Sequence, residues 1–204
     1  MPQQIAQYQF KKGLATFYAD HFTYDNATIR YKDIVSVTNQ YSEDHVYALI
    51  FITNSCILQT TFELKSGNQV ILERKGRSFW GMGSNSAVRH QRTDITTVIK
   101  EHLAPYIVDY LLKTIAKEEF VQIFTYRISP AGITKTTGAQ KGELLDAKDF
   151  GSVHADRKGS VTILTKSDKK FIGSANYLLP GTAKNALVVP DLLHKLFILG
   201  AKPQ

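Results

Sequence analysis

Residues 31–37 read YKDIVSV and residues 147–153 read AKDFGSV. Each segment contains Lys-Asp, an apolar residue, one variable position and then Ser-Val. Upstream, DHFT at 20–23 corresponds to AGIT at 131–134, so the offset is 111 residues there and 116 residues at the first pair. Recurrence of this kind indicates an internal duplication, and a repeat of about 100 residues has the size of a complete domain.

The order of expected elements is also the same on both sides of residue 117. Short runs rich in β-branched and aromatic residues precede a helical pattern of apolar residues in each half. We therefore expect two domains, 1–117 and 118–204, with closing helices at about 93–117 and about 189–199. Pro105 inside the first helical pattern predicts a kink or a junction of two helices. The expected strands are 14–19, 27–31, 46–53, 56–64 and 69–74, then 121–128, 132–137, 142–147, 160–166 and 170–174.

The composition is that of a folded protein without disulfides. Of the 204 residues 43% are apolar, and the single cysteine, Cys56, cannot form an internal disulfide and suits a reducing compartment. The first twelve residues lack the order of a signal peptide. The longest strongly apolar run, 46–52, is far shorter than the roughly 20 residues of a membrane-spanning helix. We expect a cytoplasmic protein that has no integral membrane segment and that could associate with the surface of a membrane.

The net charge is +7, and it is spread over both halves. Residues 1–117 contain 13 Lys and Arg against 10 Asp and Glu, and the remainder contains 12 against 8, so the halves carry +3 and +4. This excess permits association with nucleic acid or with a lipid surface. Nucleic-acid-binding domains usually concentrate their charge more strongly, which disfavours that class.

Six or seven short antiparallel strands closed by an amphipathic helix resemble the pleckstrin-homology-like (PH-like) superfold, including its bacterial and GRAM-like members. In this superfold a segment with a characteristic sequence pattern connects the first strands to the later ones. IRYKDIVSV at 29–37 matches that pattern well, and LLDAKDFGSV at 144–153 matches it less well. KNALVVPDLLHKL at 184–196 is similar to the helix entry of such domains. The resemblance implies an α+β, mainly β fold: two partly open barrels, each closed by a C-terminal helix. A single large barrel or sandwich with an inserted helix is the alternative.

The resemblance also implies what such domains bind, namely phosphoinositides, peptides or other proteins. PH-like domains that bind phosphoinositides carry several Lys or Arg around their first hairpin. Here the first hairpins are interpreted as ADHFTYDN at 19–26 and SPAGIT at 129–134, and neither contains Lys or Arg. This departure argues against the usual inositol phosphate pocket in either domain and leaves a different lipid site or protein docking.

The sequence shows no pattern typical of an enzyme. The six histidines have no metal-binding spacing, no second cysteine accompanies Cys56, and no nucleophile elbow or phosphate-binding loop is present. The repeated Asp33 and Asp149 are expected to cap turns by accepting backbone N–H bonds. We expect a protein that is not an enzyme and has no catalytic residue, metal or cofactor.

One basic and aromatic stretch stands out, RKGRSFWGMGSNSAVRHQR at 74–92. We interpret it as a long loop that joins the last strand of the first domain to its helix. Trp80 is expected either to pack against the barrel or to lie at a bilayer interface, where Trp and flanking cations are favoured. The candidate residues for anion, lipid or partner binding are Arg74, Lys75, Arg77, Phe79, Trp80, Arg89 and Arg92.

These patterns together predict a binding or adaptor protein of tandem PH-like domains, which docks on a protein or on an anionic membrane surface. The alternative is a nucleic-acid-associated protein that uses the 74–92 stretch for phosphate contacts and base stacking. The sequence does not determine the oligomeric state.

Overall fold

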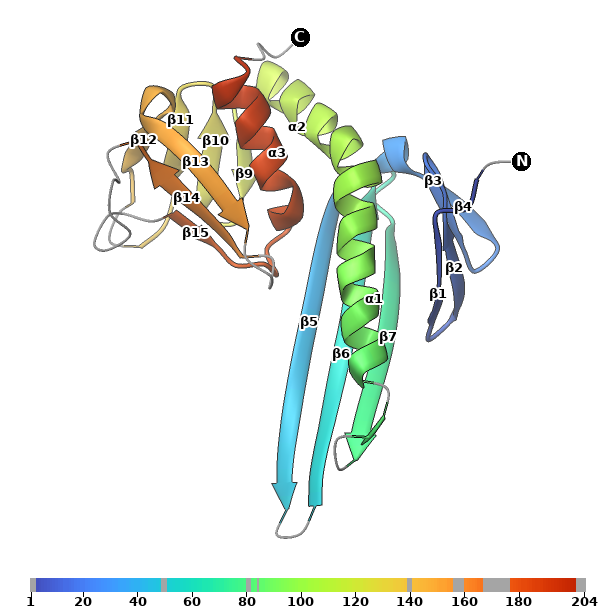
Figure 1. Cartoon of the computed structure of the whole chain (residues 1–204). Coiled ribbons are helices and arrows are strands. Elements are labelled where there is room, and N and C mark those ends of the chain that lie inside the picture. The colour runs from blue at the N-terminus through green and yellow to red at the C-terminus, as the bar shows by residue number, and fades with distance from the viewer. Residues whose placement is uncertain are drawn as a thin grey trace. The chain divides into compact units, whose positions relative to one another are not determined.

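The fold is described from a computed structural model that covers residues 3–48, 51–79, 82–83, 85–138, 141–155, 160–166 and 177–200. The chain divides into two compact units, Met1–Leu103 and Ala104–Gln204. The fold is mainly β, with four antiparallel sheets (Figure 1). Among the described residues none of these sheets closes on itself, since each has two different edge strands.

The first unit begins with a four-stranded antiparallel meander, called sheet A. Its first turn is formed by Lys11 and Lys12, and its last turn by Asp25 and Asn26, which adopt φ of 51° and 60°. Asp and Asn tolerate this left-handed conformation, and it suits a two-residue hairpin turn. The strands are β1 (Ala6–Phe10), β2 (Gly13–Phe17), β3 (His21–Tyr24) and β4 (Ala27–Arg30).

A short 3-10 helix, η1 (Tyr31–Asp33), leads from sheet A into a second meander, called sheet B. The expected turn at 65–68 is confirmed, because Gly67 has φ of 83° and the Leu64 N–H donates to the Asn68 carbonyl at 2.8 Å. The first two strands form a long hairpin with continuous pairing from Ser36–Glu63 to Ala48–Phe51. The strands of sheet B are β5 (Ile34–Ala48), β6 (Phe51–Leu64), β7 (Gln69–Phe79) and β8 (Met82–Gly83).

Helix α1 (Asn85–Val98) packs against sheet B, and the chain continues through a π-helical turn, Ile99–Leu103. The π-helical turn ends two residues before Pro105, which lacks an N–H to donate to the preceding turn. The interruption expected at Pro105 is therefore present as a change of helix type. The core of the unit contains these side chains, each less than 2% exposed: Phe17, Phe22, Tyr31, Phe62, Leu72, Ile95 and Ile99.

The second unit begins with helix α2 (Ala104–Glu118), and its two sheets follow. Sheet C is the four-stranded meander β9 (Val121–Ile123), β10 (Tyr126–Ser129), β11 (Gly132–Lys135) and β12 (Leu144–Asp146). The 3-10 helix η3 (Ala147–Asp149) leads into sheet D, which consists of β13 (Phe150–Ala155), β14 (Val161–Thr165) and β15 (Tyr177–Leu179). The 3-10 helix η4 (Ala186–Val188), helix α3 (Val189–Leu193) and the π-helical turn η5 (His194–Ile198) close the unit.

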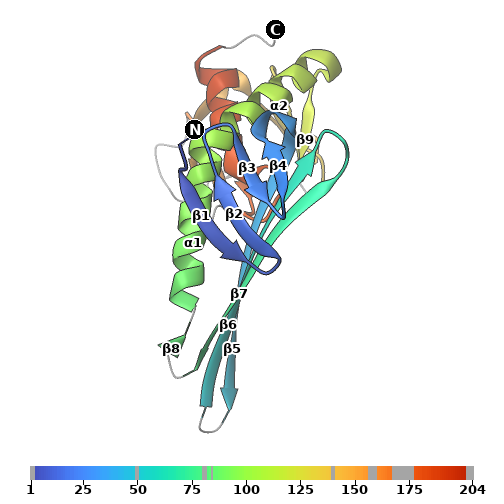
Figure 2. The ribbon, with the colours of Figure 1, turned by 90° about the vertical axis from the view of Figure 1, so that its right-hand side faces the viewer.

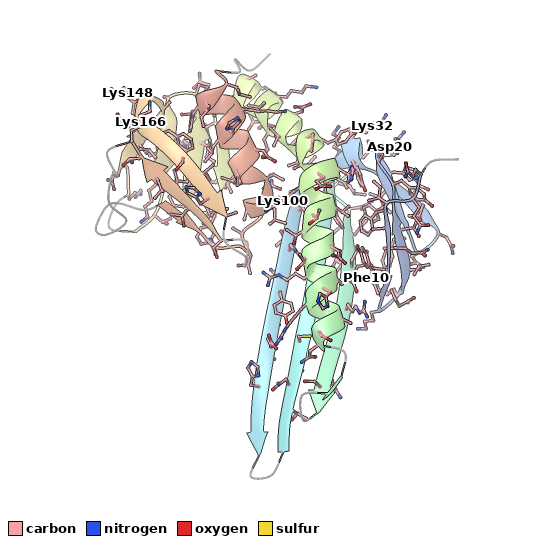
Figure 3. All side chains as sticks on the ribbon, viewed as in Figure 1. Phe10, Asp20, Lys32, Lys100, Lys148 and Lys166 are labelled. Carbon is pink, nitrogen blue, oxygen red and sulfur yellow. The ribbon has the colours of Figure 1, made fainter. Side chains whose placement is uncertain are left out.

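The two Lys-Asp segments occupy the same kind of turn in the two units. The carbonyl of Asp33 accepts the N–H of Lys65 at 2.8 Å, and the carbonyl of Asp149 accepts the N–H of Lys166 at 2.9 Å. In unit 2 the Lys166 ammonium also donates to the Lys148 carbonyl at 2.6 Å, and both lysines are labelled in Figure 3. In both units, therefore, the main chain of the repeated Asp ties the turn to the end of the second strand of the following sheet.

Several expected boundaries in the first unit are wrong. The strand expected at 46–53 is the end of β5 and the start of β6, which pair with each other through Ala48 and Phe51. Helix α1 begins at Asn85 and not at residue 93. The prediction missed its first turns because two of the three residues buried there, Asn85 and Gln91, are polar, and Val88 alone gives no apolar rhythm. Strands β1 and β3 were not expected.

In the second unit the single strand expected at 121–128 is a hairpin, β9 and β10. Strand β13, which follows the Lys-Asp turn, was also missed. The expected strand 170–174 lies outside the described residues. The final helix, expected at 189–199, is present as α3 and η5.

Candidate functional site: a basic pocket beside the first hairpin

The stretch 74–92 is not a long loop where the structure describes it. Arg74, Lys75 and Arg77 lie in β7, Phe79 is its last residue, and residues 85–92 belong to α1. Trp80 lies outside the described residues, so its expected packing or exposure is not tested. The predicted site residues are therefore divided between a strand and a helix.

Two of the predicted cations are engaged inside the first unit. The Arg89 guanidinium forms a hydrogen-bonded ion pair with Glu43 and donates from Nε to the Tyr41 hydroxyl at 3.3 Å. The Arg92 guanidinium stacks over the ring of Tyr41, 4.9 Å from its centroid. The Arg89 guanidinium holds the pKa of the Glu43 carboxyl below its usual range. These arginines fasten α1 to β5, which is a structural role.

Two other predicted cations, Arg74 and Lys75, line a cavity of about 350 Å³ together with Lys11. Gln9 and Phe10, at the end of β1, form the remaining wall. Phe10 is labelled in Figure 3, and its ring meets the ring of Tyr24 edge to face at 6.1 Å. The structure thus joins the first hairpin turn of the chain to the middle of β7.

A backbone contact holds the two walls of this pocket together. The N–H of Lys11 donates to the carbonyl of Glu73 at 2.8 Å. The Glu73 carboxylate then lies between two ammonium groups, at 3.5 Å from Lys11 Nζ and 3.8 Å from Lys75 Nζ. Its side chain is 26% exposed, against 64% for Lys11 and 59% for Lys75. One partly buried acid is therefore paired with two exposed cations that line the pocket.

The third cation, Arg74, is positioned by helix α1. Its guanidinium donates to the side-chain oxygen of Gln91, which is only 2% exposed. Gln91 lies on the face of α1 that packs against sheet B. A buried amide that accepts from a guanidinium restricts where that guanidinium lies, so Arg74 presents its charge from a defined position.

Three cations against one carboxylate leave the pocket positively charged, and its size suits a small anion or a headgroup. Lys and Arg bind phosphate through charge-assisted hydrogen bonds. The groups that would hold a metal are different, and no cluster of three or more His, Cys, Asp or Glu occurs among the residues that the structure describes. The arrangement is suited to anion binding.

The pocket corrects our interpretation of the first hairpin. The first hairpin of unit 1 is β1–β2, and its turn is the pair Lys11 and Lys12, whereas residues 19–26 form the later turns of sheet A. The expected absence of cations is therefore wrong for unit 1. In unit 2 the first hairpin is β9–β10, and its turn, Phe124–Thr125, contains no cation.

No protein-family model, curated protein sequence or solved structure matches this chain. Within the described part of the chain, no helix combines the length and apolar character needed to cross a membrane.

Sequence reasoning missed the half of the pocket that comes from β1. The residues Gln9, Phe10 and Lys11 precede Gly13 in the segment QFKKG, which has the composition of a strand end and a cationic turn. The signal was weak because β1 reads AQYQF, with no β-branched residue and with Gln at alternate positions.

Proposed function

We propose that the chain is a non-enzymatic binding protein of two tandem PH-like domains that docks on an anionic membrane surface. The observation that carries this proposal is the cavity between the first hairpin and β7, lined by Lys11, Arg74 and Lys75. Its ligand would be a phosphate-bearing lipid headgroup.

The order of elements supports the tandem PH-like interpretation. In each unit a four-stranded meander leads through a 3-10 turn into a second meander. A helix follows the second meander in each case, α1 after sheet B and α3 after sheet D. The matching hydrogen bonds of Asp33 and Asp149 are expected if the units arose by duplication, since unrelated domains would not share this detail.

The placement of the pocket supports a headgroup ligand. A PH-like domain that binds phosphoinositides uses cations around its first hairpin, and Lys11 and Lys12 form that turn in unit 1. Each exposed lysine near an anionic leaflet contributes about 1 kcal/mol to binding. The corresponding turn of unit 2 lacks cations, so we assign the headgroup site to unit 1 alone.

Sedimentation of the full chain with vesicles tests the proposal. We expect binding to phosphatidylcholine vesicles that contain phosphatidylserine or phosphoinositide, and little binding to phosphatidylcholine alone. The double variant Lys11→Ala, Lys75→Ala should weaken binding roughly thirtyfold, at about 1 kcal/mol for each lysine. The matched control is Lys32→Ala, Lys100→Ala, which removes the same charge from exposed positions of unit 1 that do not line the pocket (Figure 3).

An equal loss in both double variants would mean that total charge and not the pocket determines binding, and would refute the headgroup site. Binding to RNA or DNA but not to anionic vesicles would favour the nucleic-acid alternative and overturn the proposal. Both nucleic acids should therefore be measured at the same salt concentration as the vesicles.

A further inference from the structure

The first hairpin of the second unit carries an aromatic residue at its turn. Strands β9 and β10 pair as far as Ile123 and Tyr126, so Phe124 and Thr125 form a two-residue turn. The Phe124 side chain is 55% exposed. Single exposed apolar residues are common on protein surfaces, but this one also has an unfavourable backbone conformation.

Phe124 adopts a left-handed conformation, with φ of 54°. The central positions of a two-residue hairpin turn favour Gly, Asn or Asp, because a bulky side chain is crowded at positive φ. The chain follows this preference at the last turn of sheet A, where Asp25 and Asn26 adopt φ of 51° and 60°. A phenylalanine at this position is therefore unfavourable for the local fold. Residues that break a local preference in this way are concentrated at functional sites.

Hydrogen bonds from the neighbouring strand ends hold the turn in this conformation. Gln122 Nε2 donates to the Phe124 carbonyl at 2.8 Å and to the Thr136 hydroxyl at 3.1 Å. The Thr125 carbonyl accepts the Thr136 N–H at 2.7 Å and the Thr136 hydroxyl at 2.9 Å. The carbonyl groups of the turn are thus satisfied within sheet C, and the exposed ring extends from a backbone that needs no partner to define it.

The register of sheet C places a second exposed apolar side chain at the same end. Leu144 of the edge strand β12 is 51% exposed and pairs with Thr134 of β11 (Figure 1). Thr134 pairs with Arg127 of β10, which pairs in turn with Gln122 of β9. Phe124 comes two residues after Gln122. Phe124 and Leu144 therefore lie at one end of sheet C, with β11 between them.

Cations accompany these apolar residues. Arg127 and Lys135 lie on β10 and β11 next to the turn, and Lys141 lies in the connection to β12. Glu143 belongs to the same end, since its carbonyl accepts the Lys135 N–H at 3.2 Å. Three cations against one acid leave an excess of two positive charges. Apolar residues flanked by cations are attracted to an anionic lipid surface, whereas the same end of a second copy would be repelled.

We propose that the β9–β10 turn inserts Phe124 into the interfacial region of an anionic bilayer, with Leu144 at the membrane surface. This inference rests on the proposed membrane docking and adds a contact from the second unit, in which an apolar residue enters the lipid. In unit 1 the turn of the first hairpin, β1–β2, consists of Lys11 and Lys12 (Figure 2). The two first hairpins therefore contribute different interactions, charge attraction from unit 1 and apolar insertion from unit 2.

A tryptophan at the turn tests insertion. In the variant Trp80→Phe, Phe124→Trp the only tryptophan lies at position 124. The full chain is mixed with phosphatidylcholine–phosphatidylserine vesicles whose acyl chains carry bromine, which quenches tryptophan fluorescence on close approach. We expect a blue shift of the emission and quenching by brominated but not by ordinary vesicles. The control variant is Trp80→Phe, Tyr110→Trp, at a 38% exposed position of α2, and equal quenching of the two variants would refute the proposal.

Phe124→Asn separates membrane binding from folding. Asn tolerates the left-handed conformation better than Phe, so the urea midpoint should stay the same or rise. Vesicle binding should weaken roughly tenfold, because transfer of the ring out of water is lost. Tyr110→Asn, at the exposed aromatic position of α2, should leave vesicle binding unchanged.

Two results with Phe124→Asn would overturn the proposal. A lower urea midpoint would show that the ring packs within the unit. Unchanged vesicle binding would show that the ring does not enter the lipid.

The pocket proposal and the insertion proposal fail in different ways. Sedimentation without quenching at position 124 would overturn insertion while leaving the pocket proposal intact. Quenching that persists when Lys11→Ala and Lys75→Ala are added, after correction for the bound fraction, supports insertion whatever happens to headgroup selectivity. Loss of all vesicle binding by the wild-type chain would refute both. A concentration-dependent dimer in light scattering that Phe124→Asn abolishes would assign the turn to a second copy and overturn insertion.

Discussion

The N–H of Lys11 donates to the carbonyl oxygen of Glu73 at 2.8 Å, which joins the first hairpin turn to β7. Because of this bond, the Lys11 ammonium, which lines the basic pocket, comes within 3.5 Å of the Glu73 carboxylate. Glu73 therefore acts as an internal counter-ion, and it competes with any anion that approaches Lys11 and Lys75.

Glu73→Gln should strengthen anion binding by the pocket. The substitution keeps the shape of the side chain and removes the negative charge, so a bound phosphate no longer competes with a carboxylate. Loss of one like charge at about 4 Å is worth about 1 kcal/mol in a water-like medium, which corresponds to a roughly fivefold tighter Kd. Isothermal titration of the full chain with inositol trisphosphate measures the change.

Glu118→Gln provides the control for this experiment, because it makes the same change at an exposed position of α2 in the other unit. It should alter the Kd little. Weaker binding by Glu73→Gln, with the fold intact by circular dichroism, would show that the carboxylate organises the pocket and does not compete with the ligand.

The Arg89–Glu43 pair should make stability depend on pH in the acidic range. The Arg89 guanidinium lowers the pKa of Glu43 in the folded protein below its ordinary value of 4.5. A carboxyl with a lowered folded pKa stabilises the fold fully above its unfolded pKa, and this contribution is lost as pH falls through the folded value. Glu43→Gln should therefore lower the urea midpoint at pH 7, and the difference from wild type should shrink below about pH 4.5. A difference that stays constant down to acid pH would contradict this cause.

The elements that were predictable from sequence are those with a single dominant pattern. The helix around Ile95 and Leu103 has three- and four-residue apolar spacing, and the turn around Gly67 has the composition of a tight hairpin. The start of helix α1 was predicted too late because Asn85 and Gln91, which are buried in its first turns at 6% and 2% exposure, are polar. A search for apolar periodicity does not recognise such positions.

The long hairpin was missed for a related reason. The inner part of β5 contains the polar residues Ser36, Asn39 and Gln40, and no strand was expected between residues 31 and 46. Asn39 is buried because its amide accepts from Thr60 and donates to Thr96, contacts that cross to another strand and to α1. Polar residues buried by such long-range partners cannot be recognised from local sequence.

The candidate site was predictable only in part. Arg74 and Lys75 belong to the conspicuous basic stretch and line the pocket. Lys11 lies more than 60 residues away in sequence, and it reaches them because β1 meets β7. Arg89 and Arg92 were predicted to bind a ligand because of their charge. The Arg89 guanidinium is paired with Glu43, and the Arg92 guanidinium stacks over the ring of Tyr41.

Cys56 should be unreactive in the folded protein. Its side chain is 1% exposed, its thiol donates to Asn85 Oδ1 at 3.3 Å, and burial raises the pKa of the thiol. Because the thiolate is the reactive form, iodoacetamide should modify native Cys56 far more slowly than the urea-unfolded chain at the same pH. Mass spectrometry at timed intervals measures both rates. Comparable rates would show that α1 separates readily from sheet B.

Gly76→Ala should loosen the packing of α1 on sheet B. A Cβ at this position would approach Cys56 Sγ at 2.8 Å, Asn85 Oδ1 at 2.9 Å and Val88 Cγ2 at 2.9 Å, so these side chains or the first turns of α1 must shift. Overpacking of this kind costs about 1–3 kcal/mol, which a urea titration detects. Cys56 should also become more reactive, because its hydrogen-bond partner moves with the helix.

Ser42→Ala, at an exposed position of β5, is the control and should change neither the urea midpoint nor the reactivity of Cys56. Unchanged stability and reactivity in Gly76→Ala would mean that the helix and the sheet have room for a methyl group.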